Sequence, residues 1–589
     1  MPEPEPNTSA LDRTAARIAI AAVAIGVVLR IWVLTQRGSL WLDEASLALN
    51  VLGRDFAGLL RPLDWGQAAP VGFLWLERAL TGLLGTAEWV LRLLPAMAGG
   101  VTIWLVWEVG RRSVGRLAGA LTAAALAGSL IAIRYSAEAK PYATDACVAL
   151  ALVALALAVL ERPEALRRWA MLGAAGAIAV TFSLPSVFVL GAIGIAVAPS
   201  AWRGRLAIRF TAVAAGLSWL AVFGALWALV IRESSGGAYL REYWAPVMLA
   251  VSAPDFVARL IRAVASVVAT PLQWTGSVTL ALMMTAVWLV GLAMLAWRNW
   301  CHAVLLAGPF LLAAIASMIG VYPLSDRLAF FASPLALLTA ALPVGLVVAR
   351  VSASGASPAR LAAPWLVAPW LAALAVAGWV GSDAWRIVRA PGALEPTRAL
   401  FRSVKATADS SGAGVYVFAR AVPAWLYATT DWKAIDRARL AAYVEASGGT
   451  DSQGHENFAR PGGISPGDGE GLVGRAEFAT RGGRSAFTAL EFIGLAPGVR
   501  YRIAGPTSAD APSPGWAEEE ARRISMIIDG SFTPVAWVVA SHFFEGTARD
   551  ELRPLVAAIS AKGLQVAEER RGGRDAVALK VISPSRPAP

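Results

Sequence analysis

Long apolar runs separated by short charged loops make up most of the first 381 residues of this chain. A bilayer core of about 30 Å requires roughly 20 apolar residues in a helix. Runs of about that length predict roughly eleven membrane-spanning helices. We place them near residues 16–36, 89–109, 117–134, 143–160, 169–183, 185–200, 210–231, 276–296, 302–320, 328–349 and 362–381.

The segment between the first two predicted spans is long and partly apolar. Its stretches EASLALNVLGRDFAGLL and VGFLWLERALTGLL carry apolar residues at helical spacing with charges between them, which predicts two interfacial helices lying on the membrane. The first span follows a polar tail with Arg13 and Arg17. It is longer than a signal-peptide core and no convincing small-residue cleavage site follows it, so we expect a retained anchor.

The pattern changes after residue 381, where strand-like and amphipathic segments alternate. The chain reads GVYVFARAVPAWLYA at 414–428, is glycine-rich from about 448 to 486, and ends with VAWVVASHFF, DELRPLVAAISAKG and AVALKVI. Strand, helix and strand in this order predict a small α/β domain. We expect a membrane domain over 1–381 and an α/β domain over 382–589, with the glycine-rich stretch a mobile loop rather than a ligand cradle.

Composition agrees with a polytopic α-helical membrane protein. Of 589 residues, 57% are hydrophobic and 16% charged, and the mean hydropathy of +0.57 excludes an ordinary soluble globule. A net charge of +11 would suggest nucleic-acid binding in a soluble domain. Here the arginines gather in short loops between apolar runs, so membrane topology explains the charge and we expect no nucleic-acid partner.

The arginine-rich loops also predict the orientation of the chain. GRRSVGR, ERPEALRR and WRGRLAIR all fall on one side if the N-terminus is cytoplasmic, as the positive-inside rule requires. An odd number of spans then places the C-terminal domain outside, together with residues 37–88, 135–142 and 321–327. We expect a multi-pass protein of the plasma or inner membrane, in contact with membrane lipids, whose active site is extracytoplasmic.

Several common kinds of site are unsupported. Cys147 and Cys301 lie in or at the edge of apolar runs, and the three histidines are far apart in sequence, so neither a disulfide framework nor a zinc site is indicated. No Walker loop or dinucleotide-binding fingerprint occurs, which gives no support for ATP or NAD.

The first candidate site is the acidic pair Asp43 and Glu44, just beyond the first span. A carboxylate inside hydrocarbon costs on the order of 3 kcal/mol, so carboxylates near a membrane tend to lie where water or substrate reaches them. Acidic residues in the first turn of a helix also interact favourably with its dipole. The sequence leaves both interpretations open, a catalytic pair or a helix cap.

Two further charged stretches share the predicted outer side. RYSAEAKPYATDA contains Glu138, Lys140 and Tyr142, and Lys140 is the only lysine before Lys405. An ammonium there suits a phosphate, although it is also an ordinary snorkelling anchor.

VYPLSDRLAFFASPLALL contains Tyr322, Asp326 and Arg327. An arginine on the outer side departs from the charge bias, so Arg327 either clasps Asp326 or faces an anionic ligand.

These stretches together resemble the bacterial GT-C glycosyltransferases, the superfamily of protein O-mannosyltransferases, lipid A aminoarabinose transferases and rhizobial galacturonosyltransferases. The resemblance covers most of residues 16–381. It rests on the DE pair in a long first outer loop, EWVLRLLPAMAGG, YSAEAKPYA and YPLSDRLAFFASPLALL. VYVFARAVPAWLYA also resembles the start of the trailing domain in one branch.

The resemblance implies an inverting transfer of a sugar from a polyprenyl-phosphate donor to an acceptor hydroxyl of a glycan, lipid or protein. It maps the catalytic carboxylate onto Asp43, with Glu44 beside it; a general base is what an attacking hydroxyl needs. The donor-binding set comprises Glu138, Lys140, Tyr142, Tyr322 and Arg327, whose cations and hydroxyls suit a leaving phosphate. We expect no cofactor and no metal, because oxygen-ligand cages need more carboxylates than occur here.

Some positions depart from the family pattern or have a simpler interpretation. Many relatives carry arginine where Lys140 stands, and a His-Pro-Pro phrase where this chain has QAAP at 67–70. Arg92 of the LRLL phrase is interpreted as a structural partner of a carboxylate such as Glu88. An aromatic belt explains the tryptophans near predicted span ends, which are Trp32, Trp41, Trp89 and Trp300. Only Trp41 and Trp65 are considered for sugar contact.

Two other functions fit parts of the pattern. A transporter or flippase of a lipid-linked sugar would need polar residues and helix breaks at mid-membrane in several spans, whereas the charges here cluster at one face. A noncatalytic envelope scaffold would bind the lipid donor without turning it over.

Overall fold

The computed structural model describes a helical bundle joined to a sheet domain. Up to residue 353 it describes residues 6–36, 38–63, 67–232, 244–251, 253–269, 271, 278–324 and 326–353. Beyond that it describes 378, 381–386, 388–389, 397–411, 413–417, 421–429, 476–480, 483–487, 501–503, 517–518, 521–522, 524–525, 528, 535–541, 548–571 and 576–584.

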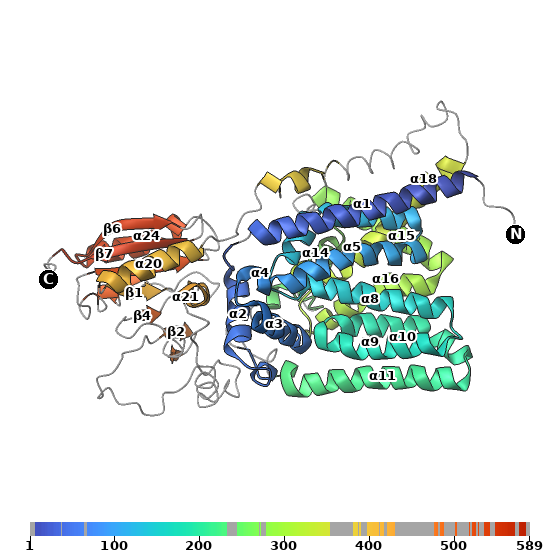
Figure 1. Ribbon diagram of the computed structural model, residues 1–589, viewed down its shortest axis with the longest axis horizontal. Coiled ribbons are helices and arrows are strands. Elements are labelled where there is room, and N and C mark those ends of the chain that lie inside the picture. The colour runs from blue at the N-terminus through green and yellow to red at the C-terminus, as the bar shows by residue number, and fades with distance from the viewer. Residues whose placement is uncertain are drawn as a thin grey trace.

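Long helices lie side by side in the bundle, and among the shorter helices α2, α3 and α4 lie at the end nearest the sheet domain (Figure 1). The long helices are α1 (Pro6–Gln36), α5 (Leu93–Ser113), α6 (Arg116–Gly128), α8 (Tyr142–Glu161), α9 (Leu166–Phe182), α10 (Ser186–Arg203), α11 (Leu206–Leu226), α14 (Phe256–Ala269), α15 (Val278–Arg298), α16 (Trp300–Met318) and α18 (Ser333–Ala353). The shorter ones are α2 (Leu42–Gly53), η1 (Gly58–Leu60), α3 (Val71–Leu84), α4 (Glu88–Leu91), α7 (Leu130–Ser136), η2 (Trp227–Ile231), η3 (Ala245–Val247), α17 (Asp326–Ala329) and η6 (Phe330–Ala332).

The predicted multi-pass architecture is confirmed. Within the described residues, eight helices are long and apolar enough to cross a membrane, and a bent pair makes a ninth. The predicted span at 169–183 forms α9, whose 17 residues extend about 25 Å. Nearly all of the predicted span at 362–381 lies outside the described residues, as does the predicted domain boundary at 381.

The predicted span at 117–134 is broken into α6 and α7, which meet at 65°. Arg30 of α1 is buried beside the break. Its guanidinium donates hydrogen bonds to the carbonyls of Leu126 and Ala127, at the end of α6, and to the hydroxyl of Ser136. Backbone carbonyls freed at a helix break need partners in a membrane, and Arg30 supplies them.

The C-terminal domain is a mixed seven-stranded sheet with the strand order β3-β2-β4-β1-β5-β7-β6. Strand β1 pairs in parallel with β4 and β5, whereas β7 pairs antiparallel with β5 and β6. Its elements are α20 (Thr397–Ser411), β1 (Gly414–Val417), α21 (Val422–Thr429), β2 (Ala476–Thr480), β3 (Gly483–Phe487), β4 (Tyr501–Ile503), β5 (Val535–Ser541), α24 (Ala548–Ala561), β6 (Gln565–Arg571) and β7 (Ala576–Ile582).

The two faces of this sheet belong to different cores. Alternate residues of β5 point to opposite faces, as they must in a strand. Ala536 and Val538 pack with α24, whereas Trp537 and Val539 join a cluster that also contains residues of α20, α21, α2 and α3. The sheet domain and the segment between α1 and α5 therefore share one hydrophobic core.

Two expectations about loops need correction. Helices α2 and α3 form as predicted, but α2 is buried from Glu44 to Leu52 beneath the C-terminal domain, so it is a packed core helix and not one lying free on the membrane. The end of the predicted glycine-rich loop forms the antiparallel pair β2 and β3. The rest of that stretch, residues 448–475, lies outside the described residues.

Candidate functional site

Asp43 and Arg327 form an ion pair at the end of the bundle that faces the sheet domain. Asp43 lies in the first turn of α2 and Arg327 in α17, 284 residues further along the chain, and Arg327 Nη1 is 2.7 Å from Asp43 Oδ2. Both side chains are about a quarter exposed, at 23% and 24%. Arg327 therefore has a carboxylate partner far away in sequence. The clasp with Asp326 stays a prediction, because the side chain of Asp326 is outside the described set.

Two tryptophans flank the guanidinium of Arg327. It lies 6.0 Å from the ring centre of Trp41 and 5.3 Å from that of Trp244, within the range of cation–π attraction. Trp41, considered from sequence for sugar contact, thus packs against the arginine, and Trp65 is not among the described residues.

Lys140 lies next to this pair in the short loop between α7 and α8. The residue is 5% exposed, and its Nζ donates a hydrogen bond to Oε1 of Gln67. Burial lowers the pKa of the Lys140 ammonium below its usual value; the carboxylate of Asp43 opposes this shift, and the guanidinium of Arg327 adds to it. The structure therefore brings together the three charged groups that the sequence predicted to converge.

Aromatic side chains line the site on the side of the bundle. Tyr142, at the start of α8, is buried and feels the charges of Arg327 and Asp43. Its ring packs edge-on against Tyr135 at 5.3 Å. Tyr322 packs against Phe188 and donates its hydroxyl proton to the carbonyl of Leu328, at 2.8 Å, so its contact with a donor stays a prediction.

Glu44 has a different environment from Asp43. It is 1% exposed, and Arg92 Nε and Nη2 donate to its two oxygens at 2.8 and 2.7 Å. The backbone N–H of Ala139 donates to Oε1 at 2.7 Å. Glu44 thereby ties α2 to the loop that carries Lys140, and Arg92, expected to pair with Glu88, pairs with Glu44 instead.

Glu138 is held in the same loop. It is also 1% exposed, and Arg134 Nε donates to its Oε1 at 2.7 Å. Its carboxylate therefore holds the guanidinium of Arg134 in place, and its part in donor binding stays a prediction.

The sheet domain contacts residues that support the site. Arg398 of α20 forms an ion pair with Glu88, and its backbone N–H donates to Oγ of Ser39 at 3.0 Å. The carbonyl of Ser39 accepts a 2.8 Å hydrogen bond from Nη2 of Arg92. A continuous set of contacts therefore runs from the sheet domain through Arg92 to Glu44.

The sequence prediction missed Gln67, Trp244 and Arg398. A signal existed for Gln67, because it stands in the QAAP phrase where relatives carry a histidine. Trp244 and Arg398 stand in stretches without any motif. Their role follows only from residues that are distant in sequence and close in space, Arg327 for Trp244 and Glu88 for Arg398.

The described residues contain no cluster of three or more His, Cys, Asp or Glu side chains that could hold a metal ion. The charged groups of the site are a carboxylate, an ammonium and a guanidinium. Such a set suits a phosphate ester better than a metal cage, and the absence of a metal from the reaction stays a prediction.

Residues 68–227 match the family described as dolichyl-phosphate-mannose-protein mannosyltransferase. The matched stretch includes Glu138, Lys140 and Tyr142, whereas Asp43 and Arg327 lie outside it. A comparison with curated proteins finds no match.

Two solved structures are similar over most of the chain. ArnT from Cupriavidus metallidurans bound to undecaprenyl phosphate has 17% identity and a TM-score of 0.45, with 95% of this chain and 97% of that chain covered. The oligosaccharyltransferase AglB from Archaeoglobus fulgidus, in complex with an inhibitory peptide and a dolichol-phosphate, has 12% identity and a TM-score of 0.47, with 89% and 69% covered.

The family match confirms the resemblance to the GT-C glycosyltransferases. It also confirms the predicted enzyme class, a glycosyltransferase of the GT-C type. The apolar helices confirm a multi-pass membrane protein.

Proposed function

We propose that this glycosyltransferase moves a sugar from a polyprenyl-phosphate donor to an acceptor hydroxyl, with inversion at the anomeric carbon. The observation that carries the proposal is the meeting of Asp43, Lys140 and Arg327, from three distant parts of the chain, at one end of the bundle. The carboxylate of Asp43 can accept a proton, and the cations Lys140 and Arg327 can neutralise a phosphate. An in-line displacement on a sugar phosphate needs that combination.

In the proposed reaction, Asp43 accepts the proton of the acceptor hydroxyl as its oxygen attacks the anomeric carbon. The bond between that carbon and the phosphate oxygen breaks, and the electron pair leaves with the polyprenyl phosphate. Lys140 and Arg327 stabilise the charge that develops on the phosphate. Arg327 is placed to do so because its guanidinium has several N–H groups and can contact Asp43 and a phosphate together.

Glu44 has a positioning role in this proposal. Both its oxygens are engaged by Arg92, and one also accepts from Ala139. A carboxylate so fully bonded is a poor proton acceptor, because hydrogen bonds to the charged form stabilise it. It fixes Asp43 on α2 relative to the loop that carries Lys140.

We place the reaction on the extracytoplasmic side. Arginine-rich loops follow α5, α8 and α10, at the ends of these helices away from Asp43. By the positive-inside rule those ends face the cytoplasm, so the site and the sheet domain face outward. The acceptor is a glycan, lipid or protein hydroxyl reaching the membrane surface there.

A transporter of the same lipid is the second candidate, and the geometry favours it less. The described helices include one bent pair, α6 and α7, and Arg30 bonds the carbonyls at the bend. Alternating access needs discontinuous helices around a central site. The charged site here lies at one end of the bundle.

The proposal is tested with purified protein in lipid vesicles. The mass of the copurifying lipid identifies the donor headgroup, and release of polyprenyl phosphate from that lipid measures turnover. We expect Asp43→Asn to lower turnover about 10²- to 10⁴-fold, the usual contribution of a general base, while the lipid still copurifies. Asp12→Asn, an exposed carboxylate at the far end of the bundle, is the matched control. Unchanged turnover in Asp43→Asn would exclude this residue as the base.

A further inference from the structure

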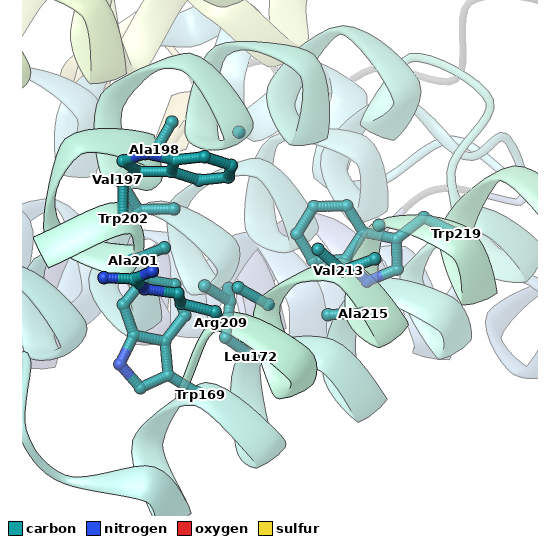
Figure 2. Close-up of a pocket in the computed structure, with 13 residues that line it drawn as sticks. Trp169, Leu172, Val197, Ala198, Ala201, Trp202, Arg209, Val213, Ala215 and Trp219 are labelled. Atoms are coloured by element: carbon teal, nitrogen blue, oxygen red, sulfur yellow. The ribbon is translucent and has the colours of Figure 1, made fainter. Parts of the chain in front are cut away.

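A hollow lies between α9, α10 and α11, at the end of the bundle away from Asp43. Its volume is about 220 Å³. Figure 2 shows tryptophans from all three helices around it, together with Arg209. The lining is Trp169, Leu172, Gly194, Val197, Ala198, Ala201, Trp202, Arg209, Ala212, Val213, Ala215, Gly216 and Trp219.

The interior of the hollow is apolar although it contains indoles. Trp169 Nε1 donates to the carbonyl of Pro163 and Trp219 Nε1 to that of Gly173, both at 2.9 Å. These N–H groups are already used, so the two rings offer carbon surface to a ligand. An apolar chain fits such a lining, whereas a sugar would leave its hydroxyls without partners.

A cation marks one end of the hollow. Arg209, at the start of α11, lies 5.8 Å above the ring of Trp202, and its Nε donates to the carbonyl of Gly204 at 3.1 Å. The Nη groups extend beyond these two contacts on an exposed side chain. Arg203 ends α10 and Arg205 immediately precedes α11, which makes this end suitable for a phosphate.

The length of the hollow matches one leaflet. From Arg209 to Trp219 the helix α11 rises about 15 Å, which is half of a hydrocarbon core of about 30 Å. Only Ile208 and Ala215 of α11 are buried, so this helix is the outer wall, with lipid around it. A chain that entered beside Arg209 would end near the middle of the bilayer.

Two glycines keep the hollow open. A methyl group added at Gly194 or Gly216 would meet no atom within 4 Å, and both residues belong to the lining. A larger side chain at either position would therefore occupy the hollow without displacing a neighbour.

We propose that this hollow is a binding site for an anionic phospholipid, with one acyl chain between α9, α10 and α11 and the phosphate on Arg209. The membrane is the only source of long apolar chains at this depth, and the arginines select a net negative headgroup. The site is separate from the proposed catalytic one, which lies at the other end of α9 and α10.

Native mass spectrometry of the full-length protein tests the proposal. Protein released from nanodiscs of equal phosphatidylglycerol and phosphatidylcholine should retain phosphatidylglycerol. We expect Gly216→Leu and Arg209→Gln each to reduce its retention about tenfold, through a filled hollow and a lost charge-assisted contact.

Two variants serve as matched controls. Gly224→Leu adds the same side chain to α11 at another open position outside the lining. Arg298→Gln removes one exposed arginine from the end of α15. Both should retain phosphatidylglycerol as the wild type does.

Three outcomes would overturn the proposal. They are equal retention of the two phospholipids by the wild type, retention unchanged in Gly216→Leu, or equal losses in the controls. Donor turnover is measured separately, and its failure would contradict the proposed catalytic function while leaving this lipid site untouched.

Discussion

Asp43 and Glu44 are adjacent in sequence but lie in different surroundings. Asp43 is about a quarter exposed and shares an ion pair with Arg327, whereas Glu44 is buried with Arg92. Breaking a buried ion pair leaves the partner charge without compensation, which costs about 3–5 kcal/mol. Replacing Asp43 should therefore lower mainly turnover, whereas replacing Glu44 should lower mainly the stability of the fold.

Replacing Glu44 should mainly lower the stability of the fold. We expect Glu44→Ala to lower the free energy of unfolding by about 3–5 kcal/mol, visible as a lower thermal midpoint of the detergent-solubilised protein. Asp12→Ala, at an exposed ion pair with Arg116, should change it by less than about 1 kcal/mol. A Glu44→Ala protein as stable as the wild type would contradict the positioning role.

Lys140 makes donor binding sensitive to alkaline pH. Burial lowers the pKa of its ammonium below the usual value, so the charged form that attracts phosphate is lost as pH rises through this lowered pKa. As the pH is raised, donor binding should therefore begin to weaken before the pH reaches the ordinary lysine pKa of about 10.4. In Lys140→Arg this loss should disappear, because a guanidinium stays charged; identical pH profiles would contradict the assignment.

The sequence predicted the charged groups of the site but not most of their partners. Asp43, Lys140 and Arg327 each stand out as charges beside apolar runs, and a common membrane face brings them together. Arg92 pairs with a carboxylate as predicted, but that carboxylate is Glu44, 48 residues away, and not the neighbouring Glu88 given as the example. A pattern along the chain carries no signal for such a choice.

At the scale of elements, the break between α6 and α7 depends on one buried arginine. We expect Arg30→Met to lower the free energy of unfolding by about 2–3 kcal/mol, since hydrogen bonds from a charged group to buried carbonyls are lost. Arg17→Met, an exposed arginine on the same helix, is the control. Equal thermal midpoints of the two variants would contradict this account of the break.

The apolar runs predicted most spans, because span length follows from bilayer thickness. The 65° bend was not predicted, since the apolar run continues through Ser129 without interruption. Helix α14 was missed as well. Its 14 residues are too few to cross a bilayer, and Arg259 and Arg262 interrupt its apolar residues, so no span was predicted there.

At the scale of the whole molecule, the sheet domain packs against the helices that carry the site. Tyr427 of α21 donates its hydroxyl proton to the carbonyl of Thr86 at 3.0 Å, and Arg398 pairs with Glu88. Phe401, Trp425 and Trp537, all fully buried, belong to the core shared with α2 and α3. Movement of this domain would therefore shift the loop that carries Arg92.

A charge exchange tests this coupling. We expect Arg398→Glu to lower sugar transfer and the thermal midpoint, because two carboxylates would then face each other at a cost of several kcal/mol. The double variant Glu88→Arg with Arg398→Glu should restore both. Failure of the exchange to restore transfer, while the thermal midpoint recovers, would contradict a role of this pair in positioning the site.

The sheet domain itself could be predicted from strand and helix patterns near 414–428 and 535–582, which the structure confirms. Its contact with the segment between α1 and α5 could not be predicted from these patterns. That core joins Ala45 and Trp537. The hydrophobic positions around each residue predict that its segment is buried, but they do not identify the segment against which it packs. The partner is decided by tertiary packing.

The most direct test of the central claim is the affinity for a polyprenyl monophosphate, measured by titration of the purified protein. We expect Lys140→Gln and Arg327→Gln each to weaken binding about 10- to 100-fold. Their double variant should lose less than the product of the two, because both groups hold one phosphate. Arg298→Gln is the control for net charge. Wild-type affinity in both single variants would contradict a shared phosphate site.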